Sequence, residues 1–383
     1  MKATRTVRML VPHHTQYGRS IIQGAWQYAR EHTSWKLVMS QISFGMPHYR
    51  QTSIQADAVL ARIVDRKLLN TVKKMNLPTV DVCEAFDSGV PKLVSDPQVI
   101  AQTALEHLGG CGFSSFAFCG VPGENYSHWR RDAFEQQVTA AGYPCHICPE
   151  SSQKLSYKQE LRRLARWLKK LPKPIGILTC NDWRGQHVLA ACELAGLSVP
   201  EEVGILGVDN DTIVCVTCPV DMSSIDIGTV QMGYQAMQMI AQMIQKPKAK
   251  QPAVTYGHQC QVINRQSTDL VTDDPMVRCA LEMMRQTDPL PTTVQTIIDQ
   301  LPISRRPFEI RFEKAIGRSP HAELTRRRIA LAKSLLSNSS LAIEAIGIRC
   351  GYRYAHHFSA TFTRKVGVTP SAFRSRQPTV PGK

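Results

Sequence analysis

Residues 350 to 362, CGYRYAHHFSATF, bring together side chains that could do chemistry in two different ways. Cysteine thiolates and histidine imidazoles are zinc ligands, so Cys350, His356 and His357 could form a metal site. The same stretch could be a turn and a helix whose exposed side chains contact DNA bases. The positions of the neighbouring aromatic residues distinguish the two interpretations.

Phe358 and Phe362 are four residues apart, which is the spacing of one buried face of a helix. If both face the core, then Ala355, His356 and Ser359 face outward, and His356 and His357 point in different directions. A zinc site on a helix needs histidines at i and i+4, or paired cysteines. We therefore predict no metal site here and a DNA-contacting helix instead.

The surrounding sequence repeats one arrangement twice, about fifty residues apart. In the first copy Ser304 can cap a helix anchored by Phe308 and Phe312. In the second copy a helix over Leu341 to Cys350 leads through Gly351-Tyr352 into the helix described above. Each copy is a helix, a tight turn and a second helix, the layout in which the second helix enters a major groove.

The charge distribution supports a polyanionic partner for this part of the chain. The 383 residues include 46 Lys and Arg against 31 Asp and Glu, a formal net charge of +15. Residues 276 to 383 hold 18 basic and 7 acidic side chains, so most of the excess lies in the last quarter. A basic block on a small domain favours binding to nucleic acid.

At this point the sequence resembles a family. Residues 343 to 374 resemble the second helix-turn-helix of the AraC/XylS transcription regulators, and residues 304 to 320 resemble the first recognition helix and its turn. Two positions depart from the family pattern: Pro302 stands where a turn glycine is usual, and Gly347 where alanine is usual. The matching positions are Ile343, Ile346, Gly351, Phe358, Phe362, Gly367, Thr369, Pro370, Phe373 and Arg374.

The resemblance implies double-stranded DNA as a partner, and helix periodicity predicts which side chains face it. Arginine paired with guanine is the commonest specific contact, so Arg305 and Arg306 are expected to read bases. Phosphate contacts or solvated charges are expected at Arg326, Arg327, Arg328, Arg364, Lys365 and Arg374. The full set of predicted DNA-binding residues is Arg305, Arg306, Glu309, Arg353, His356, Ser359 and Arg364.

The N-terminal two thirds of the chain alternate short apolar runs with amphipathic segments, as in Val7 to Val11, Ala58 to Val64 and the expected helix Arg131 to Ala141. This alternation predicts an α/β fold of parallel sheets flanked by helices, with ligands bound beyond the carboxyl ends of the strands. The predicted domains are 5–268 as an effector and dimerisation domain, 269–275 as a linker, 276–377 as an all-α domain with two helix-turn-helix motifs, and 378–383 as a disordered tail.

Several stretches of the N-terminal domain resemble the effector domains of LacI/GalR regulators and the type I periplasmic binding proteins. The glycines of LGGCGFSSFAFCG precede a strand, so they do not form a dinucleotide-binding fingerprint. They match instead a segment of these sugar-binding families. Further matches follow in the same order at Ser127, Arg130 and Phe134, at Asn181-Asp182, at Gly207 to Asn210, and at Met232-Gly233.

The resemblance implies a two-lobed domain that binds a sugar between its lobes. Sugar hydroxyls donate and accept hydrogen bonds at once, so their sites use planar Asp, Asn and Arg groups with an aromatic ring alongside. The resemblance assigns ligand contacts to Arg130, Asp182 and Asp209. Further candidates are the neighbours Asn181 and Asn210, Tyr17 and Arg19 after the first strand, and Trp129 and Trp183 as stacking rings, although Trp183 could equally pack at a helix start. His13 and His14 could be ligand contacts, but loop histidines more often have no special role.

The twelve cysteines are interpreted as reduced thiols of a cytoplasmic protein, because no secretory signal and no apolar run of ~20 residues is present. CHIC at 145–148 and CVTC at 215–218 are both Cys-x-x-Cys pairs. Zinc ribbons separate such pairs by about 15–20 residues, whereas 66 residues intervene here. We expect small apolar side chains instead of a metal or redox site.

The domain order resembles that of the xylose-responsive members of these regulators. It implies D-xylose as effector, no other cofactor, a homodimer on DNA, RNA polymerase as a partner and activation of pentose-utilisation genes. No nucleophile or metal motif accompanies Asp182 and Asp209, so the protein is not expected to be an enzyme. Two alternatives remain open: a sugar-modifying enzyme with a DNA-binding appendage, and an architectural DNA-binding protein whose N-terminal domain only dimerises.

Overall fold

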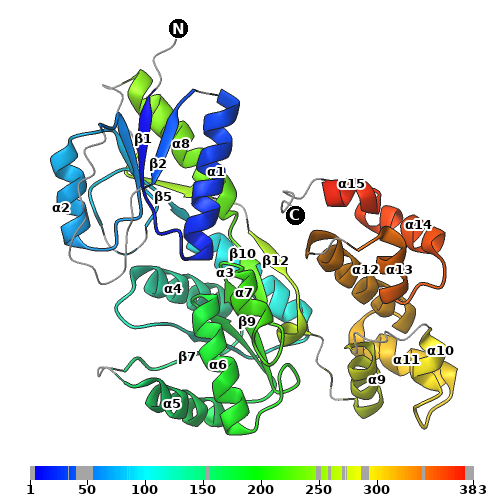
Figure 1. The fold of residues 1–383 in the computed structure, drawn as a ribbon. Helices are drawn as coiled ribbons and strands as arrows, with labels where there is room; N and C mark the ends of the chain where they lie inside the picture. Colours follow the sequence, from blue (N-terminus) through cyan, green and yellow to red (C-terminus); the bar gives the residue numbers. More distant parts are fainter. Residues whose placement is uncertain are drawn as a thin grey trace. The chain divides into compact units, whose positions relative to one another are not determined.

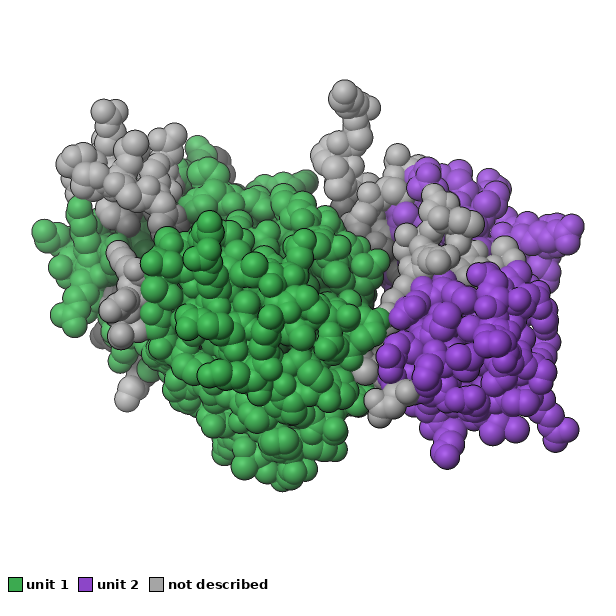
Figure 2. All heavy atoms as spheres, turned by 90° about the horizontal axis from the view of Figure 1, so that it is seen from below, with its two compact units in different colours: residues 1–269 green, residues 270–383 purple. Residues whose placement is uncertain are grey.

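The chain folds into two units, which the computed structural model divides at Met1–Asp269 and Leu270–Lys383 (Figure 2). Of the expected linker, residues 270, 271 and 273 lie outside the described residues, as does the expected tail 378–383. The structure describes residues 5–32, 34–39, 55–83, 85, 87–151, 155–246, 252–257, 260–269, 272, 274–285, 293–338 and 341–375.

The first unit consists of two lobes, each built on one six-stranded sheet with helices on both faces (Figure 1). The first sheet has the order β11-β5-β4-β3-β1-β2, and its described pairings are parallel. Its strands are β1 (Thr6–Leu10), β2 (Lys36–Met39), β3 (Ala58–Ala61), β4 (Thr79–Asp81), β5 (Lys92–Ser95) and β11 (Val254–Gly257). Its helices are α1 (Gln16–His32), α2 (Arg66–Met75) and α8 (Thr229–Gln245).

Alternate strand residues of the first lobe enter different cores, as the two-residue period of a strand requires. Leu60 of β3 packs in the core under α1 and α8, whereas Val59 packs in the core under α2. The continuous apolar runs of the sequence therefore mark strands buried on both faces, which is typical of parallel sheets.

Helices α1 and α8 approach each other closely because each carries a glycine at the contact. A Cβ added to Gly24 would lie 1.8 Å from the carbonyl oxygen of Val230, and one added to Gly233 would lie 2.1 Å from that of Ile21. No side chain fits at such distances, so the two glycines let the helix backbones pack directly.

The second lobe is built on a sheet of order β12-β10-β9-β8-β6-β7, in which only β12 runs antiparallel, to β10. Its strands are β6 (Phe116–Cys119), β7 (Cys145–Ile147), β8 (Ile175–Thr179), β9 (Val203–Val208), β10 (Ser223–Asp226) and β12 (Gln261–Ile263). Its helices are α3 (Pro97–Gly110), α4 (Asn125–Ala140), α5 (Tyr157–Lys170), α6 (Asp182–Ala195), α7 (Thr212–Val216) and the 3-10 turn η1 (Gln266–Thr268).

Helix α4 begins at Asn125, six residues before the expected start at Arg131. The first six residues of the helix, NYSHWR, are polar or aromatic and show no apolar periodicity, so the sequence pattern hid them. This added length matters, because it places residues of the first two turns of α4 at the boundary between the lobes.

The chain passes between the two sheets three times, after β5, after β10 and between β11 and β12. Polar residues stand just beyond the carboxyl ends of strands from both lobes: Arg62 after β3, Asn181 after β8 and Asp209 after β9. In doubly wound sheets the carboxyl ends of the strands form the ligand crevice. Here the strand ends of the two lobes line one pocket together.

The second unit is all-helical, with α9 (Pro275–Arg285), α10 (Val294–Ile298), α11 (Arg305–Ile316), α12 (Pro320–Asn338), α13 (Ile343–Arg349), α14 (Ala355–Val366) and α15 (Pro370–Ser375). Phe308 and Phe312 of α11 lie in one core, and Phe358 and Phe362 of α14 in another. The long α12 contributes to both cores, through Leu324 to the first and other apolar residues to the second. The two helix-turn-helix motifs predicted from the spacing of these phenylalanines are confirmed.

Glycines end both second helices of these motifs. Gly317 follows α11 with φ 73° and Gly367 follows α14 with φ 83°, a backbone region that favours glycine. Ser304 precedes α11 as expected, but its side chain makes no capping hydrogen bond. No helix among the described residues is long and apolar enough to cross a membrane.

Candidate functional site

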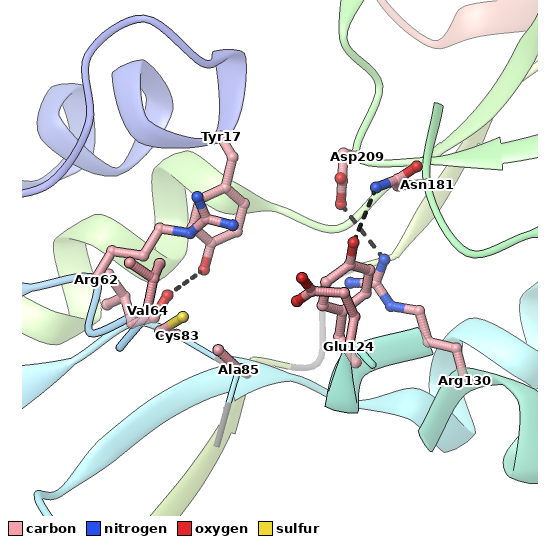
Figure 3. A pocket seen from close by; sticks show the side chains of 11 residues that line it. Tyr17, Arg62, Val64, Cys83, Ala85, Glu124, Arg130, Asn181 and Asp209 are labelled. Atoms are coloured by element: carbon pink, nitrogen blue, oxygen red, sulfur yellow. Dashed lines mark hydrogen bonds and ion pairs between the residues drawn. The ribbon is translucent and has the colours of Figure 1, made fainter. Parts of the chain in front are cut away.

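A polar pocket lies between the lobes of the first unit, with a volume of about 340 Å³ (Figure 3). This is at the small end of the ~300–1,000 Å³ typical of small-molecule sites. Both lobes contribute to its wall. The lining residues are Tyr17, Arg62, Val64, Val82, Cys83 and Ala85 from the first lobe, with Glu124, Tyr126, Arg130, Asn181 and Asp209 from the second.

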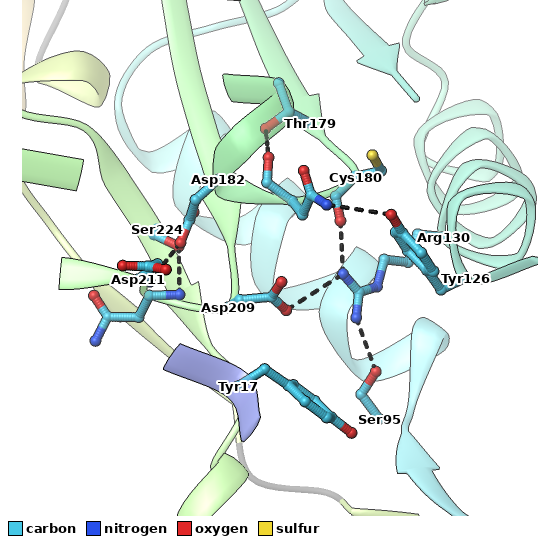
Figure 4. A network of polar contacts seen from close by, with 12 residues as sticks. Tyr17, Ser95, Tyr126, Arg130, Thr179, Cys180, Asp182, Asp209, Asp211 and Ser224 are labelled. Atoms are coloured by element: carbon cyan, nitrogen blue, oxygen red, sulfur yellow. Dashed lines mark hydrogen bonds and ion pairs between the residues drawn. The ribbon is translucent and has the colours of Figure 1, made fainter. Parts of the chain in front are cut away.

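Arg130 is the centre of the wall formed by the second lobe (Figure 4). Its side chain is 5% exposed, and its Nη1 lies 3.6 Å from Oδ1 of Asp209. The guanidinium also donates to the carbonyl oxygen of Cys180 at 2.6 Å and to the hydroxyl of Ser95 at 3.1 Å. A buried arginine is stable only when its charge and its donors are satisfied, and these contacts do so. They also hold the guanidinium in one orientation.

Tyr126 and Asn181 extend this wall. Tyr126 lies one helical turn before Arg130 on α4, and the Arg130 guanidinium lies 5.3 Å from the centre of the tyrosine ring. The side-chain nitrogen of Asn181 donates to the Tyr126 hydroxyl at 3.2 Å. Its side-chain oxygen, Oδ1, accepts from the backbone N–H of Arg184 at 2.8 Å and so caps α6. Burial raises the pKa of Tyr126 well above its ordinary value, so this hydroxyl keeps its proton.

The first lobe supplies a second aromatic and cationic pair. Tyr17, near the start of α1, donates its hydroxyl to the carbonyl oxygen of Val82 at 2.8 Å. The Arg62 guanidinium lies 5.4 Å from the centre of the Tyr17 ring. Figure 3 shows this pair on the side of the pocket opposite Arg130 and Asp209. Donors and acceptors therefore line the pocket from both lobes.

Asp182 is placed differently from its neighbours in the sequence motif. Its carboxylate is buried and accepts from the backbone of Asp211 and from the hydroxyl of Ser224, each at 2.6 Å. Burial, followed by the nearby Asp209 carboxylate, raises the pKa of Asp182 to about 8. A Cβ added to Gly207 would lie 2.1 Å from Asp182 Oδ1, so this glycine makes room for the carboxylate. Asp182 thus organises the strand ends behind the pocket and does not line it.

Tyr17, Arg130, Asn181 and Asp209 are the predicted ligand-binding residues that the structure brings together. Besides Asp182, six other candidates lie outside the pocket lining: His13, His14, Arg19, Trp129, Trp183 and Asn210. Arg19 donates to the backbone of the loop at His13 and His14, and Asn210 bonds Arg265 and Asp226. Trp129 and Trp183 are 40% and 58% exposed. Trp129 points away because the next residue on its helix, Arg130, faces the strand ends.

The remaining lining residues were not anticipated. Arg62 is the first polar residue after the apolar run of β3, and that position is a detectable signal in the sequence. Glu124 and Tyr126 precede the helix start that the apolar periodicity indicates, so only the structure reveals them. Their side chains add a carboxylate and a hydroxyl to the second-lobe wall.

The cysteine and histidine motifs do not form a metal site in the described part of the chain. Cys350 is fully buried, whereas His356 and His357 are exposed on α14. No three His, Cys, Asp or Glu side chains converge among the described residues. The four cysteines of the two Cys-x-x-Cys pairs are free thiols.

The second unit presents polar side chains on its two recognition helices, α11 and α14. Arg305 and Arg306 are exposed at the start of α11, and Arg305 pairs with Glu309 at 2.9 Å. Arg353, His356 and Arg364 are exposed on and just before α14, and Ser359 is half-buried. All seven predicted DNA-binding residues therefore reach the surface of a recognition helix or the turn before it.

The arginine run of α12 is tied into the unit. Arg326 and Arg327 both bind the fully buried carboxylate of Glu323, at 2.7 and 2.8 Å. The Arg328 guanidinium lies 5.1 Å from the centre of the Tyr352 ring, in the turn of the second motif. The pairs of Arg326 and Arg327 with Glu323 lie within α12, whereas Arg328 links α12 to the turn of the second motif.

Comparisons with known proteins agree with this architecture. Residues 105–268 match the model of a periplasmic binding protein-like domain, and residues 297–376 match that of a helix-turn-helix domain. The xylose operon regulatory protein of Haemophilus influenzae is 29% identical over 376 residues, which cover 94% of this chain and 95% of the relative. That of Escherichia coli is 28% identical over 374 residues, covering 94% of each.

A solved structure, that of a xylose-binding transcription activator, superposes with a TM-score of 0.70 at 26% identity and covers 99% of this chain and 100% of its own. These relatives are transcription regulators and not enzymes, and the matches extend over both units. The chain therefore carries a periplasmic binding protein-like domain followed by a helix-turn-helix domain, and over both units it is similar to the xylose operon regulatory proteins.

Proposed function

We propose that this regulator binds a sugar, D-xylose, in the interlobe pocket and in response activates pentose-utilisation genes in the cytoplasm. The observation that carries the proposal is the pocket wall itself, where Arg130, Asn181 and Asp209 of one lobe face Tyr17 and Arg62 of the other. Such a set donates and accepts hydrogen bonds over a small volume, as a pentose requires. The printed names of the relatives point to xylose among the sugars.

A sugar that contacts both lobes can shift the equilibrium between two arrangements of the lobes. It does so only if it binds one arrangement more tightly, and contacts from both walls provide that difference. The same difference appears, by linkage, as a sugar-dependent affinity for DNA. The pocket and the DNA-binding unit then act as two coupled sites on one chain.

On DNA, we propose that two copies of the chain bind as a homodimer and contact RNA polymerase. Helices α11 and α14 would each enter a major groove, with Arg305, Arg306 and Glu309 on the first and Arg353, His356 and Ser359 on the second facing base edges. Arg364 would contact a phosphate. The exposure of these side chains supports the assignment.

Thermal unfolding of the full chain against a panel of pentoses and hexoses tests the sugar assignment. A ligand that binds only the native state stabilises it by about 2.7 kcal/mol at ~100 times its dissociation constant. A raised Tm with D-xylose alone is the expected result. A shift with a different sugar would replace the ligand, and no shift with any sugar would contradict a sensor function and favour a module that only dimerises.

A further inference from the structure

The first unit ends in a polar segment that is nevertheless buried. We call residues 264–269 the linker root, because Asp269 is the last residue of this unit. Ser267 and Thr268 are fully buried and Asp269 is 5% exposed. Buried polar residues persist only when their hydrogen bonds are satisfied, so the contacts of this segment define what holds it.

Contacts with the second lobe hold this segment. The hydroxyl of Ser267 donates to the carbonyl oxygen of Ile205 in β9 at 2.5 Å and accepts from the backbone of Ser223 in β10 at 2.8 Å. His107 of α3 lies 2.7 Å from the Thr268 hydroxyl, and the thiol of Cys111 donates to the carbonyl oxygen of Thr268 at 2.8 Å. The linker root is therefore fixed to this lobe.

The same segment is joined to the pocket wall through Arg265. Its Nη2 donates to the side-chain oxygen of Asn210 at 2.8 Å, and its Nη1 donates to the carbonyl oxygen of Met222 at 2.9 Å. Asn210 directly follows Asp209, which lines the pocket and pairs with Arg130. Arg265 lies two residues before Ser267, so one side chain connects the pocket wall to the linker root.

The backbone at this junction adopts an uncommon conformation. Asp209 has φ 101° and Asn210 has φ 51°, both in the positive region that most residues avoid. Such residues persist when the surrounding contacts fix them. Here the fixing contacts include the bonds of Asn210 to Arg265 and to Asp226, at 2.8 and 3.3 Å.

We propose that Arg265 and Thr268 are positioning residues that couple ligand binding at Asp209 to the DNA-binding unit, although neither lines the pocket. A ligand that donates hydrogen bonds to the Asp209 carboxylate shifts the backbone conformation at Asp209 and Asn210. Arg265 transmits that change to the linker root, and Thr268 keeps the root from moving independently of the lobe. The inference rests on the proposed sugar response and assigns a route for it.

The test compares Arg265→Met and Thr268→Val with Gln266→Ala in the full chain. Gln266 lies between the two residues, and its side chain makes no hydrogen bond with any described residue, so it is a matched control. Two quantities are measured: the Kd of D-xylose without DNA, by calorimetry, and the affinity for a duplex selected from random DNA by the wild type, with and without D-xylose.

We expect the wild type and Gln266→Ala to show a sugar-dependent change in DNA affinity within the 5–150-fold range usual for allosteric coupling. In Arg265→Met and Thr268→Val this ratio should fall to less than about 3-fold, with the xylose Kd and the sugar-free DNA affinity each within about 3-fold of wild type. If both variants kept the wild-type ratio of DNA affinities with and without D-xylose, the proposal would be overturned. Loss of xylose binding in the variants would also overturn it, because the two residues would then be needed for the binding site itself.

A wild type that binds D-xylose and DNA without any coupling would refute the proposed response itself, which is a distinguishable result. Hydrogen exchange on the wild type supplies a readout that needs no variant. D-xylose should slow exchange of the amides of the linker root several-fold. Unchanged exchange throughout residues 264–269 at saturating sugar would count against the route.

Discussion

Arg130 and Asp209 approach to 3.6 Å at the pocket wall, although 78 residues separate them in the chain. Arg130 reaches this position from the second turn of α4, and Asp209 from the end of β9. The pair leaves the guanidinium fixed and the carboxylate partly accessible, which is the arrangement of a preorganised binding site.

Replacing Arg130 by alanine should remove the sugar response and leave DNA binding without sugar nearly unchanged. Hydrogen bonds to a charged group contribute about 1.5–3 kcal/mol, so the sugar Kd should rise by ~10- to 150-fold. Arg131→Ala is the control, because Arg131 lies beside it on α4 but pairs with Asp132 at 2.8 Å, outside the pocket. Calorimetry measures both variants. Equal losses of sugar and DNA affinity in Arg130→Ala would disprove the assignment.

Asp182 should make the stability of the first unit fall as the pH rises. Its pKa is raised to about 8, so between about pH 4 and 8 the folded carboxyl holds a proton that the unfolded chain has released. The stabilisation is complete at pH values below the pKa of Asp182 in the unfolded chain. It is lost as the pH rises through the pKa of Asp182 in the folded protein. The side chain of Asp182→Asn cannot ionise. The Tm of this variant should therefore rise relative to the wild-type Tm as the pH increases from 6 to 9.

Asp132→Asn provides the comparison for this pH series, because the Asp132 side chain is 62% exposed. Its Tm difference from wild type should stay constant over the same range. Thermal unfolding followed by circular dichroism at pH 6, 7, 8 and 9 measures all three proteins. A constant difference for Asp182→Asn as well would mean that Asp182 is ionised throughout.

Gly233→Ala should destabilise the first unit, because the new methyl group would lie 2.1 Å from a backbone carbonyl of α1. Overpacking of this kind costs about 1–3 kcal/mol, and a helix backbone cannot yield as a side chain can. Gly109→Ala in α3 meets no atom within 4 Å and should instead stabilise by about 0.5–1 kcal/mol through helix propensity. Urea unfolding compares the two, and equal stability would show that α1 and α8 can separate.

Arg306→Ala should relax sequence discrimination at one base pair. Loss of an arginine contact with guanine costs about 1–3 kcal/mol for the preferred base only. Arg311→Ala on the same helix is the control, since Arg311 pairs with Asp274 at 2.7 Å and does not belong to the predicted reading face. Binding to a set of single-base variants of the selected duplex measures both. Uniform weakening across all duplexes would make Arg306 a phosphate contact.

The fold could be predicted from the sequence because its signals are local and periodic. The apolar runs that became β1, β3, β8 and β9 are buried on both faces, and the phenylalanines four apart in α11 and α14 lie in the cores. Ligands placed beyond strand ends follow from the same logic. Asp209 itself was assigned through the family resemblance, and Asn181 as a neighbour of an assigned residue.

The rest of the pocket depends on helix phase and on burial, which residue types do not reveal. Trp129 was proposed for its ring, yet the rotation of 100° per residue turns it away when Arg130 faces inward. Asp182 has the chemistry of a ligand contact, but Ser224 and the backbone of Asp211 use its oxygens. Tyr126 was missed because α4 starts with residues that carry no apolar period.

The most direct measurement is the affinity of the full chain for its selected DNA duplex, determined with and without D-xylose at fixed salt. A xylose-responsive regulator should show a change of about 5–150-fold, with a dependence on D-xylose concentration that matches the Kd measured by calorimetry, and the change should disappear in Arg130→Ala. An affinity indifferent to D-xylose and to every other sugar tested would contradict it and leave an N-terminal unit that only brings two chains together.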